Sequence, residues 1–578
     1  QPRDEAMNSA TSHPTATAAN ATGTAITITS TSGGVVDGGD TDTDITANSG
    51  TVVIDAVTGV GSTNAIDTQI DTLDLDNTTS GNVDIDATGN IILTSDTAVT
   101  TVAGNIDINT SAGAIDTTAS SNTTADLVTA GGTITLQAAT GISDSDVLGL
   151  DIDSGTGAVT IVRTGTGLVN VDYSDTGSDA ITLTITAGGS GAIEYDSEST
   201  GTLTLGAITQ AGSGDLTISN LGTIAVTAVI NTSAGNDDDL SITAGSAGDI
   251  TLADVNNILT TGDGAVVLNA DGDDITVAGS STNPEILGTG TITLTANIIG
   301  SSAGNNLGLS GATALVLNDT GAGVIFIDEL AASTIAATTI TVANNSSGAI
   351  DINYNGSNVV DINDALVINS VILSNSTTST FSFTATAGNI TATAVNTADK
   401  ALTITASAGT VALVNLDTTS GNVDIDATGT ITLTINTAVT TTSGNIDINS
   451  SAGAILTTGS SNSTADLLTT GGTIRLEAAT GIRDSGSLGL DIDSATGAVT
   501  LVRDGVGLVN VDYIATGDAV TLAITDSGSG NFEYVSESTG TLTLGAITLG
   551  DGDLTISNVA TIAVTAVINT TAGTNEDL

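Results

Sequence analysis

The chain of 578 residues contains no cysteine and no tryptophan, and it has only three prolines, one methionine and one histidine. Without cysteine it can form neither a thiol nucleophile nor a zinc–thiolate site. The single histidine, His13, lies near the N-terminus, so the chain offers almost no residues from which a Ser–His–Asp catalytic triad could form. The scarcity of proline leaves backbone hydrogen-bond ladders almost uninterrupted.

Positively charged residues are also scarce. Six lysines and arginines stand against 64 aspartates and glutamates, which gives a net charge of −58. Phosphate neutralisation requires Lys and Arg, so nucleic acid is excluded as a partner. No apolar stretch approaches the ~18 residues that a bilayer span requires, so we expect no membrane insertion.

The core residues are almost entirely aliphatic. Aromatic residues make up 2% of the chain and hydrophobic residues 39%, while the 69 glycines are spread along its length. Val, Ile and Thr dominate the segments between glycines, and β-branched residues suit a pleated surface. The composition therefore predicts an all-β protein with a thin, layered core and essentially no α-helix.

A large internal repeat organises the chain. Residues 81–173 reappear, without a gap, as 421–513, and most of the aligned positions are identical. We assign 75–240 and 415–578 as two copies of this repeat, and 241–414 as divergent intervening coils.

A shorter sequence repeat lies within the long one. Phrases such as Gly132-Thr133-Ile134-Thr135-Leu136 and Gly201-Thr202-Leu203-Thr204-Leu205 combine a turn residue with a strand that alternates apolar and polar side chains. One such strand cannot bury its own narrow apolar face, but stacked units can. We therefore predict an elongated parallel β-helix, or β-solenoid, of about two dozen coils with ~23 residues each. Immunoglobulin-like sandwiches are the structural alternative, but they favour a core Trp and clearer linkers.

The two ends of the chain differ from the middle. Residues 1–22 show no clear alternation and are predicted to form a flexible or docking arm, whereas 23–578 are predicted to be one continuous solenoid. In the first copy, Asn231-Thr232-Ser233-Ala234-Gly235 leads into a new strand at Leu240. The equivalent segment of the second copy ends at Leu578, on the first residue of the same strand motif. Because solenoids need polar caps, we expect either more protein beyond Leu578 or end-to-end self-association.

The phrases Ile242-Thr243-Ala244 to Ile250-Thr251-Leu252, and Ile404-Thr405-Ala406 to Val411-Ala412-Leu413, resemble the repeats of filamentous-haemagglutinin-type and β-strand-repeat surface proteins of bacteria. The resemblance implies a secreted, prokaryotic, extracellular or cell-surface protein with a long β-helical body. Members of that class act as adhesins, sheath components or fibres.

The acidic residues suggest a cation partner. Aspartates that face outward on successive coils lie within ~5 Å of one another and repel unless cations intervene. We therefore expect divalent cations, most plausibly Ca²⁺, with solvated acidic turns as the alternative; no other cofactor is required. The candidate metal ligands are four clusters of closely spaced aspartates: Asp40, Asp42 and Asp44; Asp237, Asp238 and Asp239; Asp271, Asp273 and Asp274; Asp551 and Asp553.

An enzyme is the distant alternative, because β-helical proteins include polysaccharide hydrolases and lyases. Arg163 and Arg503 occupy equivalent positions in the two copies, which predicts a packing role for them, since an enzyme usually needs one site. We assign no catalytic residue and expect no enzymatic activity. The expected function is that of an extracellular structural protein forming or belonging to a filament, fibre or sheath by end-to-end stacking. An adhesin-type stalk or a surface-layer component is the alternative.

Overall fold

A computed structural model describes residues 16–18 and 23–570, with gaps at 95, 119–122, 145–148, 236, 255–256, 271, 280–283, 301–305, 313, 320–324, 330–336, 345–349, 355–364, 374–379, 386–388, 393–394, 398–400, 435, 459–460, 462 and 487. Within these residues there is no helix, and the paired strands are parallel. The chain divides into two compact units, Gln1–Ala278 and Gly279–Leu578. The predicted all-β solenoid of parallel strands is confirmed.

The strands of the first unit lie in three stacks. The first stack contains β1 (Ala16–Ala18), β3 (Ile45–Ala56), β4 (Ile66–Asn77), β5 (Val83–Ala87), β8 (Ile106–Thr110), β11 (Ile134–Ala138), β14 (Ala158–Arg163), β16 (Ile181–Ala187), β18 (Leu203–Gln210), β20 (Ile224–Val226), β23 (Ile250–Ala253) and β26 (Asp274–Ala278). The second contains β6 (Ile91–Leu93), β9 (Ile115–Thr117), β12 (Ile142–Asp144), β15 (Val169–Tyr173), β17 (Ile193–Ser197), β19 (Leu216–Asn220), β22 (Leu240–Ala244) and β25 (Val266–Asn269). Shorter runs form the third: β2 (Thr24–Thr29), β7 (Val99–Thr101), β10 (Leu127–Thr129), β13 (Leu150–Asp153), β21 (Ile230–Asn231) and β24 (Leu259–Thr260).

The second unit is built in the same way. Its first stack contains β27 (Ile286–Leu287), β30 (Leu307–Ser310), β32 (Ile325–Glu329), β34 (Ile350–Tyr354), β36 (Thr380–Ala385), β39 (Ala401–Ala406), β42 (Val423–Ala427), β45 (Ile446–Ser450), β48 (Ile474–Ala478), β51 (Val499–Arg503), β53 (Val520–Asp526), β55 (Leu542–Thr548) and β57 (Ile562–Val564). The second contains β28 (Thr291–Ala296), β31 (Ala314–Asp319), β33 (Ala337–Asn344), β35 (Ala365–Leu373), β37 (Asn389–Ala392), β40 (Val411–Leu413), β43 (Ile431–Leu433), β46 (Ile455–Thr457), β49 (Ile482–Asp484), β52 (Val509–Tyr513), β54 (Phe532–Ser536) and β56 (Leu554–Asn558). Short strands complete the coils: β29 (Ile298–Ile299), β38 (Val395–Asn396), β41 (Leu416–Asp417), β44 (Val439–Thr441), β47 (Leu467–Thr469), β50 (Leu490–Asp493) and β58 (Ile568–Asn569).

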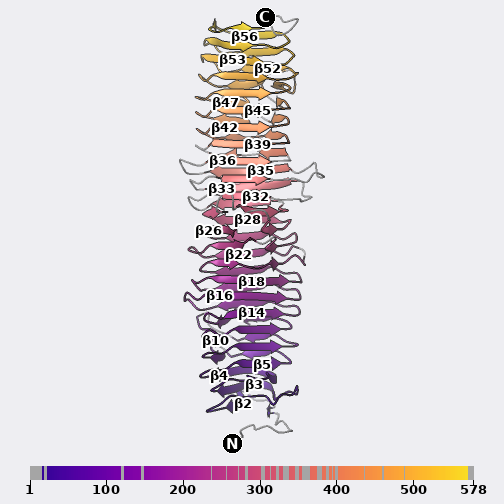
Figure 1. Ribbon diagram of the computed structural model, residues 1–578, viewed down its shortest axis with the longest axis vertical. Coiled ribbons are helices and arrows are strands. Elements are labelled where there is room, and N and C mark those ends of the chain that lie inside the picture. Colours follow the sequence, from indigo (N-terminus) through magenta and orange to yellow (C-terminus); the bar gives the residue numbers. More distant parts are fainter. Residues whose placement is uncertain are drawn as a thin grey trace. The chain divides into compact units, whose positions relative to one another are not determined.

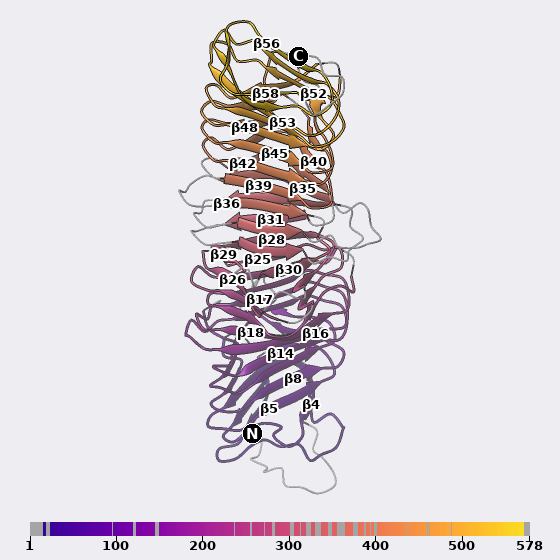
Figure 2. The same cartoon turned by 45° about the horizontal axis from the view of Figure 1, so that its top comes forward.

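Successive coils stack in register within each unit. In the first unit β14, β16 and β18 follow one another (Figure 1), and in the second unit β39, β42, β45 and β48 do the same (Figure 2). The coils number about 19 turns, fewer than the predicted two dozen. Their length varies, since Ile66 pairs with Ile85 but Ile350 pairs with Phe381. One of these coils therefore takes 19 residues and the other 31.

Period-2 alternation produces the core. On β5, β8 and β11 every second side chain is buried and its neighbours are partly exposed. Strand pairing places Ile85, Ile108 and Leu136 above one another, and all three are fully buried. Burying each such aliphatic side chain contributes about 1.5–3 kcal/mol, and each side chain is covered by the next coil. The coils therefore stabilise one another through a continuous aliphatic ladder.

A column of glycines allows the coil corners to stack closely. A Cβ atom on Gly104 would lie 2.0 Å from the carbonyl oxygen of Gly81, and one on Gly132 would lie 1.9 Å from that of Gly104. Side chains are therefore excluded at this corner by the backbone of the preceding coil. Thr129 completes the corner, because its hydroxyl donates to the Gly104 carbonyl at 2.6 Å and accepts from the Gly132 N–H at 3.2 Å.

Of the predicted N-terminal arm 1–22, only Ala16–Ala18 belongs to the described residues. These three residues form β1, which pairs in parallel with the start of β3. The rest of the arm lies outside the described residues. In the described part of the chain, no helical segment has the length and apolar character needed to cross a bilayer.

Candidate functional site

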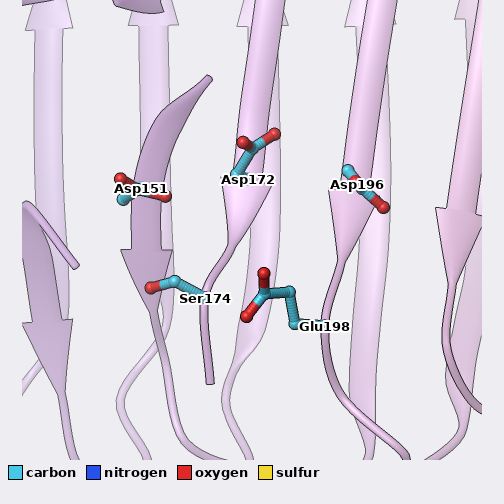
Figure 3. A pocket seen from close by; sticks show the side chains of 5 residues that line it. All are labelled: Asp151, Asp172, Ser174, Asp196 and Glu198. Atoms are coloured by element: carbon cyan, nitrogen blue, oxygen red, sulfur yellow. The ribbon is translucent and has the colours of Figure 1, made fainter. Parts of the chain in front are cut away.

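A small cavity in the first unit gathers carboxylates from three successive strands. Its volume is about 50 Å³, and it is lined by Asp151, Asp172, Ser174, Asp196 and Glu198. Asp151 on β13 pairs with Asp172 on β15, which in turn pairs with Asp196 on β17. Figure 3 shows the three aspartates side by side on neighbouring strands, with Ser174 and Glu198 beyond the strand ends. One cavity is therefore lined by four carboxylates and one hydroxyl.

Asp151 is the most confined of these groups. It is 1% exposed, and neither of its carboxylate oxygens has a hydrogen-bond partner among the described residues. Burial, together with the charges of Asp126 and Asp172, raises the pKa of Asp151 to about 8. Burial and the neighbouring Asp196 likewise raise the pKa of Asp172 to about 6. A buried carboxylate without partners is costly unless a proton or a cation compensates its charge.

The column of buried aspartates continues on the other side of Asp151. Asp126 is fully buried, and one of its carboxylate oxygens accepts a hydrogen bond from the Asp151 N–H at 3.3 Å. The other oxygen accepts from the Asp96 N–H at 3.1 Å. Burial raises the pKa of Asp126 to about 7 despite these two bonds. Backbone donors therefore satisfy Asp126, whereas the oxygens of Asp151 lack such donors among the described groups.

The second copy of the repeat has an altered version of this site. Asp491 pairs with Asp512, and Asp512 pairs with Val535, so a valine stands where the first copy has Asp196. Ile514 likewise stands where the first copy has Ser174, while Glu537 corresponds to Glu198. Asp491 is fully buried, both its carboxylate oxygens lack a described partner, and burial raises its pKa to about 7. Two of the five polar groups are therefore replaced by apolar ones.

The first predicted metal cluster is only partly brought together. Asp44 lies with Asp37 and Asp67, and one carboxylate oxygen from each falls within 4.8 Å of the others. Asp40 instead accepts a hydrogen bond from the Asp42 N–H at 2.9 Å, which closes a local turn. Burial raises the pKa of Asp44, and the charges of Asp37, Asp67 and Asp40 add to the shift. Asp67 was missed because it belongs to the next coil, and Asp37 because it lies seven residues before Asp44, outside the closely spaced run of aspartates.

The predicted metal cluster at 271–274 is also only partly brought together. Asp273 and Asp274 lie with Asp249, again with one oxygen from each within 4.8 Å of the others. The Asp274 N–H donates to the Asp249 carboxylate at 3.2 Å. Asp271 lies outside the described residues.

The three aspartates at 237–239 hold neighbouring coils together and do not converge. The Asp237 N–H donates to Asp263 at 2.8 Å, and Asp238 accepts from the Gly214 N–H at 2.8 Å. Asp239 accepts from the Ala265 N–H at 2.7 Å. Burial raises the pKa of Asp238, with nearby carboxylates adding to the shift. The carboxylates of Asp238 and Asp239 therefore accept hydrogen bonds from backbone donors of adjacent coils, whereas Asp237 contributes its backbone N–H.

Asp551 and Asp553 contribute their backbone to coil stacking. The Asp551 carbonyl accepts from the Gly530 N–H at 2.7 Å, and the Asp553 carbonyl accepts from the Phe532 N–H at 2.8 Å. Neither residue belongs to a group of three convergent carboxylates among the described residues.

Asparagines supply a further ladder between coils. The side-chain oxygen of Asn82 accepts a hydrogen bond from the Asn105 N–H at 3.1 Å, and the side-chain oxygen of Asn105 accepts one from the Thr133 N–H at 2.9 Å. The second copy repeats both bonds through Asn422 and Asn445. The polar corner residues therefore satisfy backbone groups of the next coil.

The two equivalent arginines are structural. Arg163 is fully buried and donates to the carbonyls of Gly167, Gly189 and Gly191 at 2.6–2.9 Å. Burial lowers its pKa. Because these donors are all directed at backbone carbonyls, the predicted packing role agrees with the contacts of Arg163.

The cavity is too small for an organic ligand, and no three of its carboxylates belong to a group whose oxygens all lie within 4.8 Å of one another among the described residues. Organic ligands occupy pockets of about 300–1,000 Å³, whereas about 50 Å³ is available here. Sequence reasoning missed these residues because each is a single aspartate in an alternating strand. The detectable signal was an aspartate recurring at the same place in Leu150-Asp151-Ile152, Val171-Asp172-Tyr173 and Tyr195-Asp196-Ser197.

The last described coil exposes an aliphatic face. Ile562 and Val564 on β57 are 40% and 60% exposed, whereas the equivalent Ile224 and Val226 of the first copy are fully buried. In the first copy, the coil containing β23 covers this face, through pairing of Ile224 with Ile250.

The chain matches no protein-family model, and neither the curated proteins nor the solved structures compared with it give a match.

Proposed function

We propose that this chain is an extracellular structural protein, part of a prokaryotic filament, fibre or sheath, whose coils stack end to end. The observation that carries the proposal is the stacking of successive coils, in which each aliphatic face is covered by the next coil; Ile224 and Val226 are fully buried beneath the coil that contains β23. Ile562 and Val564 occupy the equivalent places in the second copy and are 40% and 60% exposed, so another coil of the same kind fits over them, whether it belongs to the same chain or to a second copy.

The remaining features suit a structural role. Strand pairing gives each coil the same parallel edge, and an unpaired edge is a template for another strand. The net charge of −58 disfavours lateral association at low salt, so contacts at the coil ends are favoured over contacts between the sides. The extracellular location rests on the resemblance of the repeat phrases to bacterial surface proteins.

Sedimentation velocity and negative-stain electron microscopy of the chain 1–578 test the proposal. We expect concentration-dependent assembly, and we expect Ile562→Asp combined with Val564→Asp to abolish it, because two buried charges would oppose the apolar contact. Val567→Asp is the matched control. Val567 is 74% exposed, and its counterpart Val229 is 40% exposed, so this position faces solvent in both copies.

The images also separate the alternatives. Continuous filaments support the proposal. Discrete particles of one length would favour an adhesin-type stalk, and two-dimensional sheets would favour a surface-layer component. A chain that stays monomeric at high concentration, or assembly that survives the double substitution, would contradict end-to-end stacking.

A further inference from the structure

Three carboxylates converge at the first coils of the first unit. Asp37, Asp44 and Asp67 each place one carboxylate oxygen within 4.8 Å of the other two. Asp44 directly precedes β3 and Asp67 lies on β4. The Asp44 N–H donates to the Asp67 carbonyl at 2.8 Å, and the Asp67 N–H donates to the Asp44 carboxylate at 3.1 Å. An acidic cluster alone is common on so acidic a chain, so a second observation has to indicate a ligand.

The second observation is a buried carboxylate oxygen of Asp37. Asp37 is 8% exposed, and its Oδ1 is buried with no hydrogen-bond partner among the described residues. The Gly39 N–H and the Asn64 side-chain amide both donate to the other oxygen, Oδ2. Buried polar atoms nearly always have a partner, and an exception calls for an explanation such as an ion. Because the same carboxylate belongs to the convergent group, the partner of Oδ1 has to bring positive charge.

The surrounding chain supplies no such charge. Residues 14–162 contain no Lys, Arg or His. Asp86, which pairs with Asp67 on the next coil, adds a further carboxylate, and it accepts a hydrogen bond from the Asn109 side-chain amide at 3.0 Å. The acidic ladder is therefore relieved by an amide one coil further on, whereas the three converging carboxylates have no cationic side chain from their own coils.

We propose that Asp37, Asp44 and Asp67 bind one Ca²⁺ ion, which ties the corner segment before β3 to the first coils. Carboxylates bind Ca²⁺ at about 2.3–2.6 Å, so two ligand oxygens of one ion lie up to about 5 Å apart. The three oxygens meet this condition, since all lie within 4.8 Å of one another. Ca²⁺ accepts six to eight oxygens in irregular geometry, with water completing the shell, whereas Mg²⁺ demands a near-ideal octahedron. Carboxylates from one corner and two coils favour the less demanding ion.

A second acidic group provides a matched comparison. Asp249, Asp273 and Asp274 also place one oxygen each within 4.8 Å of the others. None of their carboxylate oxygens is among the described atoms that are both buried and without a partner. We therefore assign the ion to the Asp37 group and use the Asp249 group as the control.

Terbium luminescence sensitised by one introduced tryptophan tests the proposal, because Tb³⁺ replaces Ca²⁺ at oxygen sites. The chain contains no tryptophan. Val36 is 48% exposed and adjoins Asp37, so Val36→Trp in the full chain places an indole beside the group. Excitation where tyrosine does not absorb then reports only Tb³⁺ held near residue 36, since energy transfer falls steeply with distance. At about 0.15 M NaCl, which screens diffuse ion binding, we expect a saturable signal that CaCl₂ displaces more effectively than MgCl₂.

The variants decide the outcome. Asp37→Asn and Asp67→Asn, each added to Val36→Trp, should weaken Tb³⁺ binding more than tenfold, since even outer-shell changes cost about 10- to 100-fold in metal affinity. Asp274→Asn in the same background should leave the titration unchanged. Asparagine at position 37 keeps an acceptor for the Gly39 N–H, and thermal melts with chelator identify any variant that fails to fold.

Three results would overturn the proposal. The first is the absence of a saturable signal from the folded Val36→Trp chain. The second is a signal that a folded Asp37→Asn or Asp67→Asn variant leaves unchanged, and the third is an equal loss in Asp274→Asn. Displacement by MgCl₂ as effective as that by CaCl₂ would overturn the assignment of Ca²⁺.

Discussion

The guanidinium of Arg503 and the carboxylate of Asp526 form an ion pair in which both side chains are fully buried. The Arg503 Nε donates to Asp526 at 2.9 Å, and a second nitrogen donates to the Gly530 carbonyl at 2.9 Å. In the first copy Arg163 pairs across strands with Ala187, so the equivalent carboxylate is missing. The Arg163 Nε is buried and has no described partner. The buried guanidinium at this corner is therefore paired with a carboxylate in the second copy, whereas in the first copy only backbone carbonyls accept its hydrogen bonds.

Asp526→Ala should destabilise the second unit, because it leaves a buried guanidinium without its counter-charge. Breaking a buried pair costs about 3–5 kcal/mol. We expect the lower end of this range, since Arg163 is held by backbone carbonyls without a carboxylate. Differential scanning calorimetry measures the shift of the transition.

Ala187→Asp is the reciprocal change, in the first copy. It places a carboxylate at the position that Asp526 occupies in the second copy, opposite an arginine with an unsatisfied Nε. We expect the melting temperature to rise at neutral pH. A fall would show that the first copy has no room for the carboxylate and that its carbonyl cage is already sufficient.

Gly132→Ala should strain the corner of the coil. The new Cβ would lie 1.9 Å from the Gly104 carbonyl oxygen, so the backbone of one coil has to move. Overpacking costs typically about 1–3 kcal/mol, and we expect the upper end because the obstacle is backbone. Gly89→Ala is the control, because a Cβ there has no atom within 4 Å. Equal melting temperatures for the two variants would refute the close-packing argument.

Asn105→Ala should weaken the asparagine ladder between coils. In the wild type the Asn105 side-chain oxygen accepts a hydrogen bond from the Thr133 N–H at 2.9 Å, and the substitution removes this acceptor. A hydrogen bond of this kind contributes about 0.5–1.5 kcal/mol to stability. Hydrogen exchange at the Thr133 amide is the local measurement, and exchange should accelerate. Asn105→Asp retains an acceptor oxygen and should preserve most of the protection. Unchanged exchange in Asn105→Ala would mean that the ladder does not protect this amide.

Stability should fall as the pH rises from about 4 to about 8. The pKa values of Asp126 and Asp491 are raised to about 7 and that of Asp466 to about 6, in each case chiefly by burial. A carboxyl with a raised folded-state pKa binds protons more tightly when folded, so its contribution is greatest below its unfolded pKa of about 3.9 and is lost as the pH passes the folded value.

Melts at constant ionic strength with chelator measure this pH dependence. Asp466→Asn combined with Asp491→Asn is the matched variant, and it should flatten the decline between pH 5 and 8. A melting temperature that rises with pH in the wild type would contradict the direction of these shifts.

The sequence could predict those features of the fold that depend on residues close together in the chain. The alternation in Gly132-Thr133-Ile134-Thr135-Leu136 sets which side chains turn inward, and Ile134 and Leu136 are fully buried as this pattern requires. A strand with one narrow aliphatic face can be buried only by stacking, so alternation and turn glycines were enough to predict a parallel solenoid. The repeat also predicted that Arg163 and Arg503 share one packing role, and both are buried in their corners.

The grouping of the aspartates was not predictable in the same way. Asp44 was expected with Asp40 and Asp42, but it lies with Asp37 and Asp67. Neighbours along the chain alternate between faces or close local turns, whereas residues one coil apart lie side by side. The coil length varies from 19 residues at Ile66–Ile85 to 31 at Ile350–Phe381, so the partner of a given aspartate depends on the length of each corner.

The sequence by itself therefore determined the strand type, the inward and outward faces and the parallel stacking, because each of these follows from the spacing of residues within one short strand. Only the tertiary structure decided which carboxylates share the cavity around Asp151 and which of them lack a described partner. Those relationships depend on the register between coils, which backbone hydrogen bonds and the packing of corners set over distances that no local pattern encodes.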